Sequence, residues 1–149
     1  MRGISFRVRS RDDRILLTIF KGVAIEKLWW CISEDEIYNN KDESVFLDQC
    51  IDGETFLKTI SEESYHVIFA NIKAYVNPVK DSYIEDYDAF IKSECQLVLL
   101  CADVSYYEIF AKDSSVIEII KNNAKADENN FYDVEFITDE NDGRTRFSV

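Results

Sequence analysis

Glycine and proline are scarce in this chain of 149 residues, which contains four glycines and one proline. The glycines, Gly3, Gly22, Gly53 and Gly143, lie far apart, so the sequence has no glycine-rich loop of the kind that cradles phosphate groups. It also has no linker, internal repeat or low-complexity tract at which the chain would divide. We therefore expect residues 1–149 to form a single domain, a length that is enough for one hydrophobic core.

Long hydrophobic runs are absent as well. The longest apolar stretches, such as Leu97–Ala102, are far shorter than the roughly 20 residues that a membrane-spanning helix needs. The N-terminal region carries charges throughout and lacks the apolar region and the cleavage site of a secretory signal peptide. The sequence therefore predicts a cytoplasmic protein without a membrane partner.

Histidine occurs once, at His66, so a Ser-His-Asp or Cys-His catalytic system would have to use this residue. The segment 65–76 alternates like a strand: its even-numbered side is apolar, whereas its odd-numbered side turns polar at Asn71 and Lys73. His66 falls on the apolar side, which favours a core histidine with one hydrogen bond over a catalytic base. With no hydrolase motif present either, the sequence gives no positive indication of an enzyme.

Two acidic clusters invite a metal-site interpretation, and neither has the required spacing. The run at 139–142 is followed by Gly143 in the fifth position, whereas a calcium-binding EF-hand loop needs glycine sixth and glutamate twelfth. Asp86 and Asp88 flank Tyr87 on a predicted helix, where residues two apart do not share a face. We expect a solvated turn and a helix surface here, and no metal or cofactor.

The four cysteines do not form a recognisable motif. Cys31, Cys50, Cys95 and Cys101 are 19, 45 and 6 residues apart, which matches neither a zinc site nor a redox pair. Cys31 and Cys101 lie in apolar segments, where a free thiol behaves as a small hydrophobic side chain. We expect all four to be free, structural thiols in a reducing compartment.

The charge is strongly acidic and unevenly distributed. Residues 1–27 contain seven Lys and Arg against three Asp and Glu, whereas the rest contains ten against twenty-six, for a net charge of -12. Such a body repels nucleic acid and anionic membranes and steers cationic partners toward itself. The favoured interpretation of this acidity is that it keeps a cytosolic protein soluble and monomeric, and a basic protein as partner is the alternative.

Hydrophobic periodicity predicts the secondary structure. We expect strands at 3–9, 27–33, 65–76, 96–102, 106–111, 132–138 and 144–149, and helices at 10–23, 53–60, 82–91 and 113–124. The expected helix caps are Ser10, Asp52, Ser82, and Asp113 or Ser115. The polar segment 34–49 shows no clear pattern, and its order stays open.

These elements predict an α+β fold. Several consecutive strands are joined by connections too short for a parallel crossover, which needs a dozen or more residues. We therefore expect a mixed, largely antiparallel sheet of about six or seven strands, with the helices packed on one face.

Three residues are candidates for a binding site in the middle of the chain. Trp29 and Trp30 are adjacent in a predicted strand, so their side chains point to opposite faces. One can fill the core while the other is exposed for protein recognition or is covered, for example by the segment 34–49. Asp103 follows a strand that is apolar on both faces, where it is either a turn residue or a functional group.

Arg144 and Arg146 are candidates near the end of the chain. They share one side of the predicted strand 144–149, opposite Asp133 and Glu135 if a hairpin forms in simple register. Cross-strand ion pairs that stabilise the sheet are the favoured interpretation. The alternative is a binding site for an anion or a carboxylate.

Several stretches also resemble a known family. They are RGISF at 2–6, CQLVLLC at 95–101, EIFAKD at 108–113 and ITDENDGRTR at 137–146. With these stretches the chain resembles a small family of Gram-positive bacterial proteins called domain of unknown function 2691. The resemblance implies a bacterial, cytoplasmic origin and carries no activity, cofactor or catalytic residue.

Three functions remain open on the sequence alone. The first is a non-catalytic binding or regulatory protein, such as an inhibitor or immunity-type protein, whose acidic, aromatic surface meets a basic protein. The second is a small enzyme that uses carboxylate and tyrosine side chains brought together by the fold. The third is a small-ligand sensor or a self-associating structural module. The sequence does not decide the oligomeric state.

Overall fold

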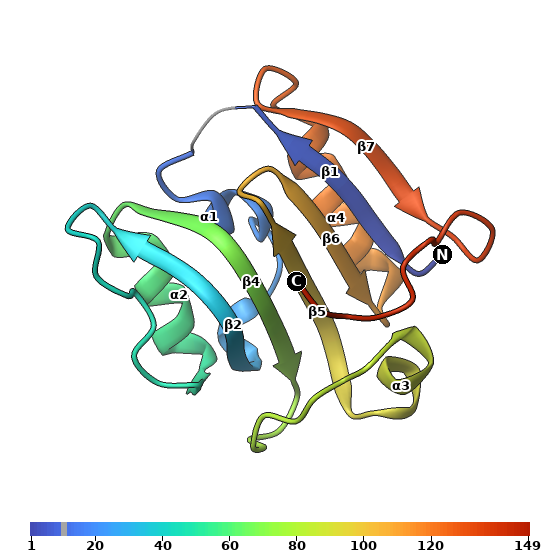
Figure 1. The fold of residues 1–149 in the computed structure, drawn as a ribbon, viewed down its shortest axis with the longest axis horizontal. Helices are drawn as coiled ribbons and strands as arrows, with labels where there is room; N and C mark the ends of the chain where they lie inside the picture. The colour runs from blue at the N-terminus through green and yellow to red at the C-terminus, as the bar shows by residue number, and fades with distance from the viewer. Residues whose placement is uncertain (10–11) are drawn as a thin grey trace.

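A computed structural model, which describes residues 1–9 and 12–149, shows seven strands in one sheet (Figure 1). The strand order is β3-β2-β4-β5-β6-β1-β7, and each pair of neighbours is antiparallel. The strands are β1 (Gly3–Val8), β2 (Trp29–Asn39), β3 (Cys50–Asp52), β4 (Tyr65–Tyr75), β5 (Cys95–Ala102), β6 (Tyr106–Ala111) and β7 (Phe131–Ile137). The predicted α+β class is confirmed.

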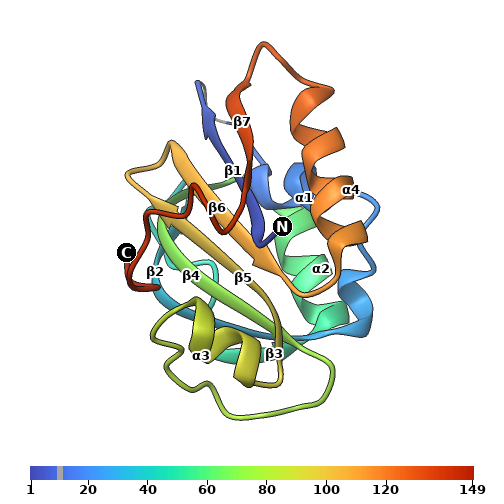
Figure 2. The same ribbon diagram turned by 90° about the vertical axis from the view of Figure 1, so that its right-hand side faces the viewer.

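Within residues 1–9 and 12–149, four α-helices and one short 3-10 helix accompany the sheet. They are α1 (Ile15–Ile19), α2 (Gly53–Glu62), α3 (Tyr87–Lys92), α4 (Ser114–Lys125) and the 3-10 helix Ile25–Lys27. Figure 2 shows α1, α2 and α4 on one side of the sheet and α3 on the other. No helix within the described residues combines the length and the apolar character that crossing a membrane requires.

The sheet face under α1, α2 and α4, called the helix face below, is apolar across the strands. A row of aligned residues runs over five strands, and its members are Ile32, Ile72, Leu99, Ile109 and Ile4. All five are buried in the larger of the two hydrophobic clusters. In the same cluster the ring of Trp30 stacks on that of Phe56 in α2, with centroids 4.2 Å apart. This face is an ordinary hydrophobic core.

The opposite face, called the mixed face below, combines apolar and polar side chains. One aligned row contains Cys50, Cys31, Lys73, Val98 and Phe110, and the next contains Ser33, Asn71, Leu100, Glu108 and Ser5. Two irregular segments cover much of this face: the strap, residues 76–86, which leads into α3, and the C-terminal segment, residues 138–149 (Figure 2).

The predicted strand at 144–149 is wrong, because the C-terminal segment crosses the mixed face and forms no strand. Phe147 is 1% exposed and packs on Phe110, with ring centroids 4.7 Å apart. Its backbone N–H donates to the carbonyl of Glu85, and its carbonyl accepts from the Asn71 side chain at 3.1 Å. Burial of this one aromatic side chain draws the segment over the sheet, away from a hairpin with β7.

The helix caps were predicted in part. Asp52 and Asp113 cap α2 and α4, as expected. The Ser82 prediction is wrong, because α3 begins later and Asp86 accepts the hydrogen bond from its first turn. The cap predicted at Ser10 lies outside the described residues, and α1 begins only at Ile15.

The expectation of four free thiols is also wrong. Cys31 in β2 and Cys50 in β3 are directly opposite and form a disulfide, with Cα atoms 4.1 Å apart. The sequence pattern did not reveal β3, a strand of three residues, so nothing indicated that Cys50 would lie beside Cys31. Cys95 and Cys101 are free and buried, as expected.

Candidate functional site

A large share of the negative charge lies at the β2–β3 edge of the sheet, within residues 34–63. This range, called the acidic edge below, comprises the end of β2, the loop 40–49, β3 and α2 (Figure 1). It contains ten Asp and Glu against two Lys, a net charge of -8 out of -12 for the whole chain. Such a net charge attracts cations and repels anions.

The loop 40–49 in the acidic edge is held in place by its own contacts. The side-chain carbonyl of Asn39 accepts from the backbone N–H groups of Lys41 and Glu43, at 2.9 and 3.0 Å. Phe46 is 9% exposed and stacks on Phe56 of α2, with ring centroids 5.7 Å apart. The next residue, Leu47, is 89% exposed. The loop is thus anchored by one apolar side chain and presents another to solvent among carboxylates.

A second candidate site is a hollow of about 590 Å³ between the C-terminal segment and the strands β6, β1 and β7. Its lining includes the polar or charged residues Ser5, Tyr106, Glu108, Glu135, Arg144 and Arg146. The structure therefore brings the two arginines singled out in the sequence into one site. It does not place them on a hairpin strand, so their predicted pairing with Asp133 and Glu135 is wrong.

Arg144 holds the C-terminal segment to the sheet. Its Nε and Nη2 atoms lie 2.6 and 2.5 Å from Oε1 of Glu108, whose side chain is 9% exposed. Its Nη1 donates to the carbonyls of Arg146 and Ser148, each at 3.0 Å. The guanidinium group is thus fully engaged within the chain. Arg146 is mostly exposed and lies 3.9 Å from Glu85, so it is the more available cation of the two.

Arg2 ties the start of the chain to the turn beside the hollow. Its guanidinium donates to Asp139 at 2.8 Å and to Asp142 at 3.0 Å, and it lies over the Tyr87 ring at 4.2 Å. The hydrogen bond from Arg2 lowers the pKa of the Asp139 carboxyl below its ordinary value. The acidic run that resembled a calcium loop is therefore used in part to bind an arginine.

Other groups in the hollow are not used by the fold. Within the described residues, the hydroxyls of Ser5 and Thr145 and the carboxylate of Glu135 have no hydrogen-bond partner. Burial, and then the nearby charge of Glu108, raise the pKa of Tyr106, so its hydroxyl stays protonated near neutral pH. These groups can bind a small polar molecule.

The remaining predicted site residues lie elsewhere. Trp30 is fully buried, and its Nε1 donates to the carbonyl of Ile25. Trp29 is half-buried, and its Nε1 donates to the carbonyl of Val79 at 2.9 Å, so the strap and not the segment 34–49 covers it. Asp103 is exposed in the β5–β6 turn with a φ of 51°. The structure does not bring these three residues to the hollow or to the acidic edge.

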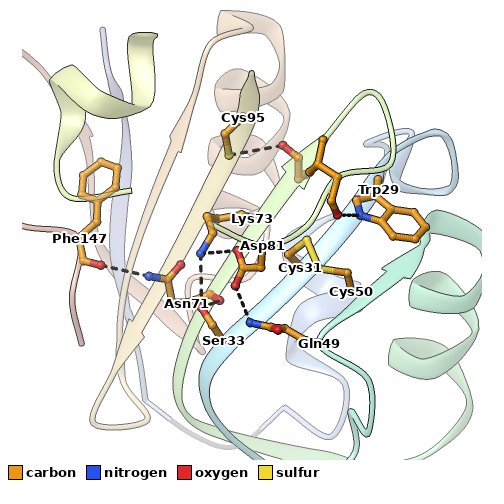
Figure 3. Close-up of polar contacts among 12 residues, drawn as sticks. Trp29, Cys31, Ser33, Gln49, Cys50, Asn71, Lys73, Asp81, Cys95 and Phe147 are labelled. Atoms are coloured by element: carbon orange, nitrogen blue, oxygen red, sulfur yellow. Dashed lines mark hydrogen bonds and ion pairs between the residues drawn. A yellow bond between two sulfur atoms is a disulfide. The ribbon is translucent and has the colours of Figure 1, made fainter. Parts of the chain in front are cut away.

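A buried polar network lies beneath the strap and was not predicted from the sequence (Figure 3). Lys73, which is 2% exposed, forms an ion pair with Asp81 at 3.0 Å, and Gln49 donates to the same carboxylate at 3.1 Å. The alternation placed Lys73 on a polar strand side, which normally faces solvent. The apolar residues on either side of Lys73 in the strand were the one signal in the sequence that it is buried.

No group of three or more His, Cys, Asp or Glu side chains suited to hold a metal ion occurs in the part of the chain that the structure describes. His66 is half-buried beside a small hollow formed with Asp12 and Tyr107. The disulfide lies between the two points at which the strap is anchored, Trp29 and Gln49 (Figure 3).

Comparison with known proteins adds one family and one relative. The sequence model of a family described as "Protein of unknown function (DUF2691)" matches residues 1–148. The "Uncharacterized protein YncE" of Bacillus subtilis (strain 168) is 34% identical over 153 residues, which cover 99% of this chain and 99% of that protein. No solved structure matches the chain significantly.

Proposed function

The chain belongs to the DUF2691 family of bacterial proteins, and we propose that this member is a non-catalytic binding or regulatory protein that recognises a basic protein through its acidic edge. The observation that carries the proposal is the anchored loop 40–49, which presents Leu47 among Asp and Glu side chains. An inhibitor or immunity-type protein uses such a surface to meet a cationic partner.

The charge and the apolar side chain have separate roles in this proposal. The net charge of -8 on the acidic edge accelerates encounter with a cationic surface and makes binding sensitive to salt. Leu47 then contributes apolar contact area once the partner has docked, which slows dissociation. Because the loop is already held by Phe46 and Asn39, little ordering entropy is lost on binding.

The same surface determines which partners are disfavoured. Nucleic acid and anionic membranes are repelled by the acidic edge, so neither belongs to the proposal. We propose the cytoplasm as the compartment in which the partner occurs. The two free, buried thiols Cys95 and Cys101 agree with such a reducing environment, whereas a lasting Cys31–Cys50 disulfide would be an exception in it.

The test is affinity co-purification of the tagged protein from bacterial lysate at low and at high salt, read by mass spectrometry. We expect a basic protein that is retained at low salt and lost at high salt. Leu47→Ser, and separately the combined change of Asp42, Glu43 and Asp48 to Asn or Gln, should abolish its retention. A complex that is insensitive to both salt and these changes would contradict the proposal.

Matched control variants separate the acidic edge from general acidity. Glu118 and Glu128 are exposed carboxylates outside the acidic edge, and Val76 is a 61% exposed apolar side chain on the strap. Glu118→Gln with Glu128→Gln, and separately Val76→Ser, should leave retention unchanged. Loss of the partner in these controls would move the binding surface away from the loop 40–49.

The hollow favours a second candidate function, a sensor of a small polar ligand. Its volume of about 590 Å³ lies within the range of small-molecule sites, and Glu135 and Arg146 offer opposite charges at its wall. A thermal-shift screen of polar metabolites tests this function. A hit should disappear in Arg146→Ala or Glu135→Gln, whereas the Leu47→Ser change should leave it intact.

A further inference from the structure

The two sulfur atoms of the Cys31–Cys50 disulfide differ in their surroundings. Cys31 is 0% exposed and belongs to β2, which has a neighbouring strand on each side. Cys50 is half-buried and belongs to β3, the outermost strand of the sheet. The disulfide therefore spans from the interior of the mixed face to its edge.

We propose that Cys50 is a site of reversible modification by low-molecular-weight thiols. The thiolate of the small molecule attacks Sγ of Cys50, the Cys31–Cys50 bond breaks, and Cys31 leaves as a thiolate that takes a proton from water. The products are a mixed disulfide on Cys50 and a free thiol on Cys31, so no further oxidant or reductant is consumed. This inference goes beyond the proposed function and does not depend on it.

Access decides which sulfur is attacked. In thiol–disulfide exchange the attacking thiolate approaches one sulfur along the line of the bond, opposite the sulfur that leaves. Cys31 is 0% exposed and lies in one hydrophobic cluster with Val79 and Ile84 of the strap, which is anchored near the disulfide by the Trp29–Val79 and Gln49–Asp81 hydrogen bonds (Figure 3). Cys50 is half-buried on the outermost strand, so its sulfur is the one that we expect a small thiol to reach.

The other two cysteines do not compete for the small thiol. Cys95 and Cys101 are each 0% exposed in β5, the central strand of the sheet. Burial raises the pKa of the Cys95 thiol to about 11 and that of Cys101 to about 12, so both stay protonated near neutral pH. The modification is therefore confined to one position in the folded chain.

The backbone around β3 makes the exchange reversible. Trp30 pairs with Ile51, and the N–H of Ile32 donates to the carbonyl of Gln49 at 2.7 Å, contacts that do not involve the sulfur atoms. These contacts keep Cys31 opposite Cys50 after the bond has opened. Once Cys31 has given its proton back to water, its thiolate can attack Sγ of Cys50, expel the small thiol as a thiolate that is protonated in turn, and restore the disulfide.

The experiment uses the folded full chain and reduced glutathione as the probe, followed by acid quench, alkylation of free thiols and peptide mass mapping. We expect one glutathione for each modified chain, on Cys50, with Cys31 recovered as an alkylated free thiol. Removal of glutathione should restore the disulfide. Modification of Cys31, or no adduct under conditions in which the urea-unfolded chain reacts, would overturn the inference.

A matched pair of single variants tests the asymmetry directly with oxidised glutathione. Cys31→Ser leaves the half-buried thiol, and Cys50→Ser leaves the fully buried one. Cys31→Ser should react at least roughly tenfold faster, since burial suppresses both access and ionisation of a thiol. Circular dichroism first establishes that both variants are folded, and equal rates in two folded variants would refute the proposed selectivity.

Discussion

The two faces of the sheet are built in different ways. The helix face is apolar in every aligned row, and α1, α2 and α4 cover it. The mixed face carries Lys73, Asn71 and Glu108 in positions that are at most 7% exposed, and irregular segments cover it. Apolar side chains on a hydrophobic face can pack against many different apolar groups. Each buried polar side chain on a mixed face needs its own hydrogen-bond or ion-pair partner. The difference predicts how each face responds to substitution.

The largest effect is expected on the helix face. Phe56→Ala removes a fully buried ring that stacks on Trp30 and Phe46, so it should lower the free energy of unfolding by about 3–5 kcal/mol. Phe147→Ala on the mixed face should cost less, because the C-terminal segment can detach without unfolding the sheet. Urea denaturation measures both costs. Hydrogen exchange should show that Phe147→Ala releases only the C-terminal segment. An equal loss of unfolding free energy in Phe56→Ala and Phe147→Ala would contradict the proposed difference between the two faces.

The next effect concerns the ion pair beneath the strap. Lys73→Ala leaves Asp81 as a buried carboxylate without its cation, which should cost about 3 kcal/mol or more. Lys58→Ala is the matched control, because Lys58 and Glu62 form an exposed pair 3.9 Å apart and contribute little. Chemical denaturation of both variants gives the two costs. Similar values would show that the mixed face does not depend on its buried ion pair.

A somewhat smaller effect is expected from the disulfide, which constrains the unfolded chain over a separation of 19 residues. Reduction should lower the free energy of unfolding by about 2–4 kcal/mol. The measurement is urea denaturation with and without a dithiol reductant. The stability of the Cys31→Ser, Cys50→Ser double variant should not change with the reductant. If the reductant does not change the stability of the parent protein either, the result would be evidence against the disulfide.

The smallest effect is a dependence on pH at the exposed end of the mixed face. The pKa of Asp139 is lowered in the folded state by its hydrogen bond from Arg2. The ionised Asp139 carboxylate therefore contributes its full stabilisation above the ordinary pKa of 3.8. This contribution is lost as the pH falls through the lower pKa of the folded state. Arg2→Met should return the pKa of Asp139 to its ordinary value, measured by NMR titration. An unchanged titration would exclude this contact in solution.

The helix face was largely predictable from the sequence. The strands β1, β5 and β6 and the caps Asp52 and Asp113 follow from alternation and from local hydrogen bonding, which involve residues close together in the chain. The candidate site was predictable only in part. Arg144 and Arg146 were identified, but their surroundings were assigned to a hairpin that does not form.

The mixed face was not predictable, because its contacts join distant parts of the chain. Arg144 meets Glu108 over 36 residues, and Asn71 meets Phe147 over 76. A polar residue in an alternating strand has the same pattern whether it faces water or a segment that folds over it. The alternation placed Lys73 on a polar strand side and for this reason did not reveal that it is buried.

The sequence by itself determined the α+β class, the apolar helix face and the concentration of acidic residues, since each depends on composition or on local periodicity. Only the tertiary structure decided that Cys31 meets Cys50, that Lys73 is buried and that Arg144 binds Glu108. These contacts depend on where β3, the strap and the C-terminal segment lie on the sheet. Their positions are set by a few long-range contacts, such as the burial of Phe147, which leave no periodic signal along the chain.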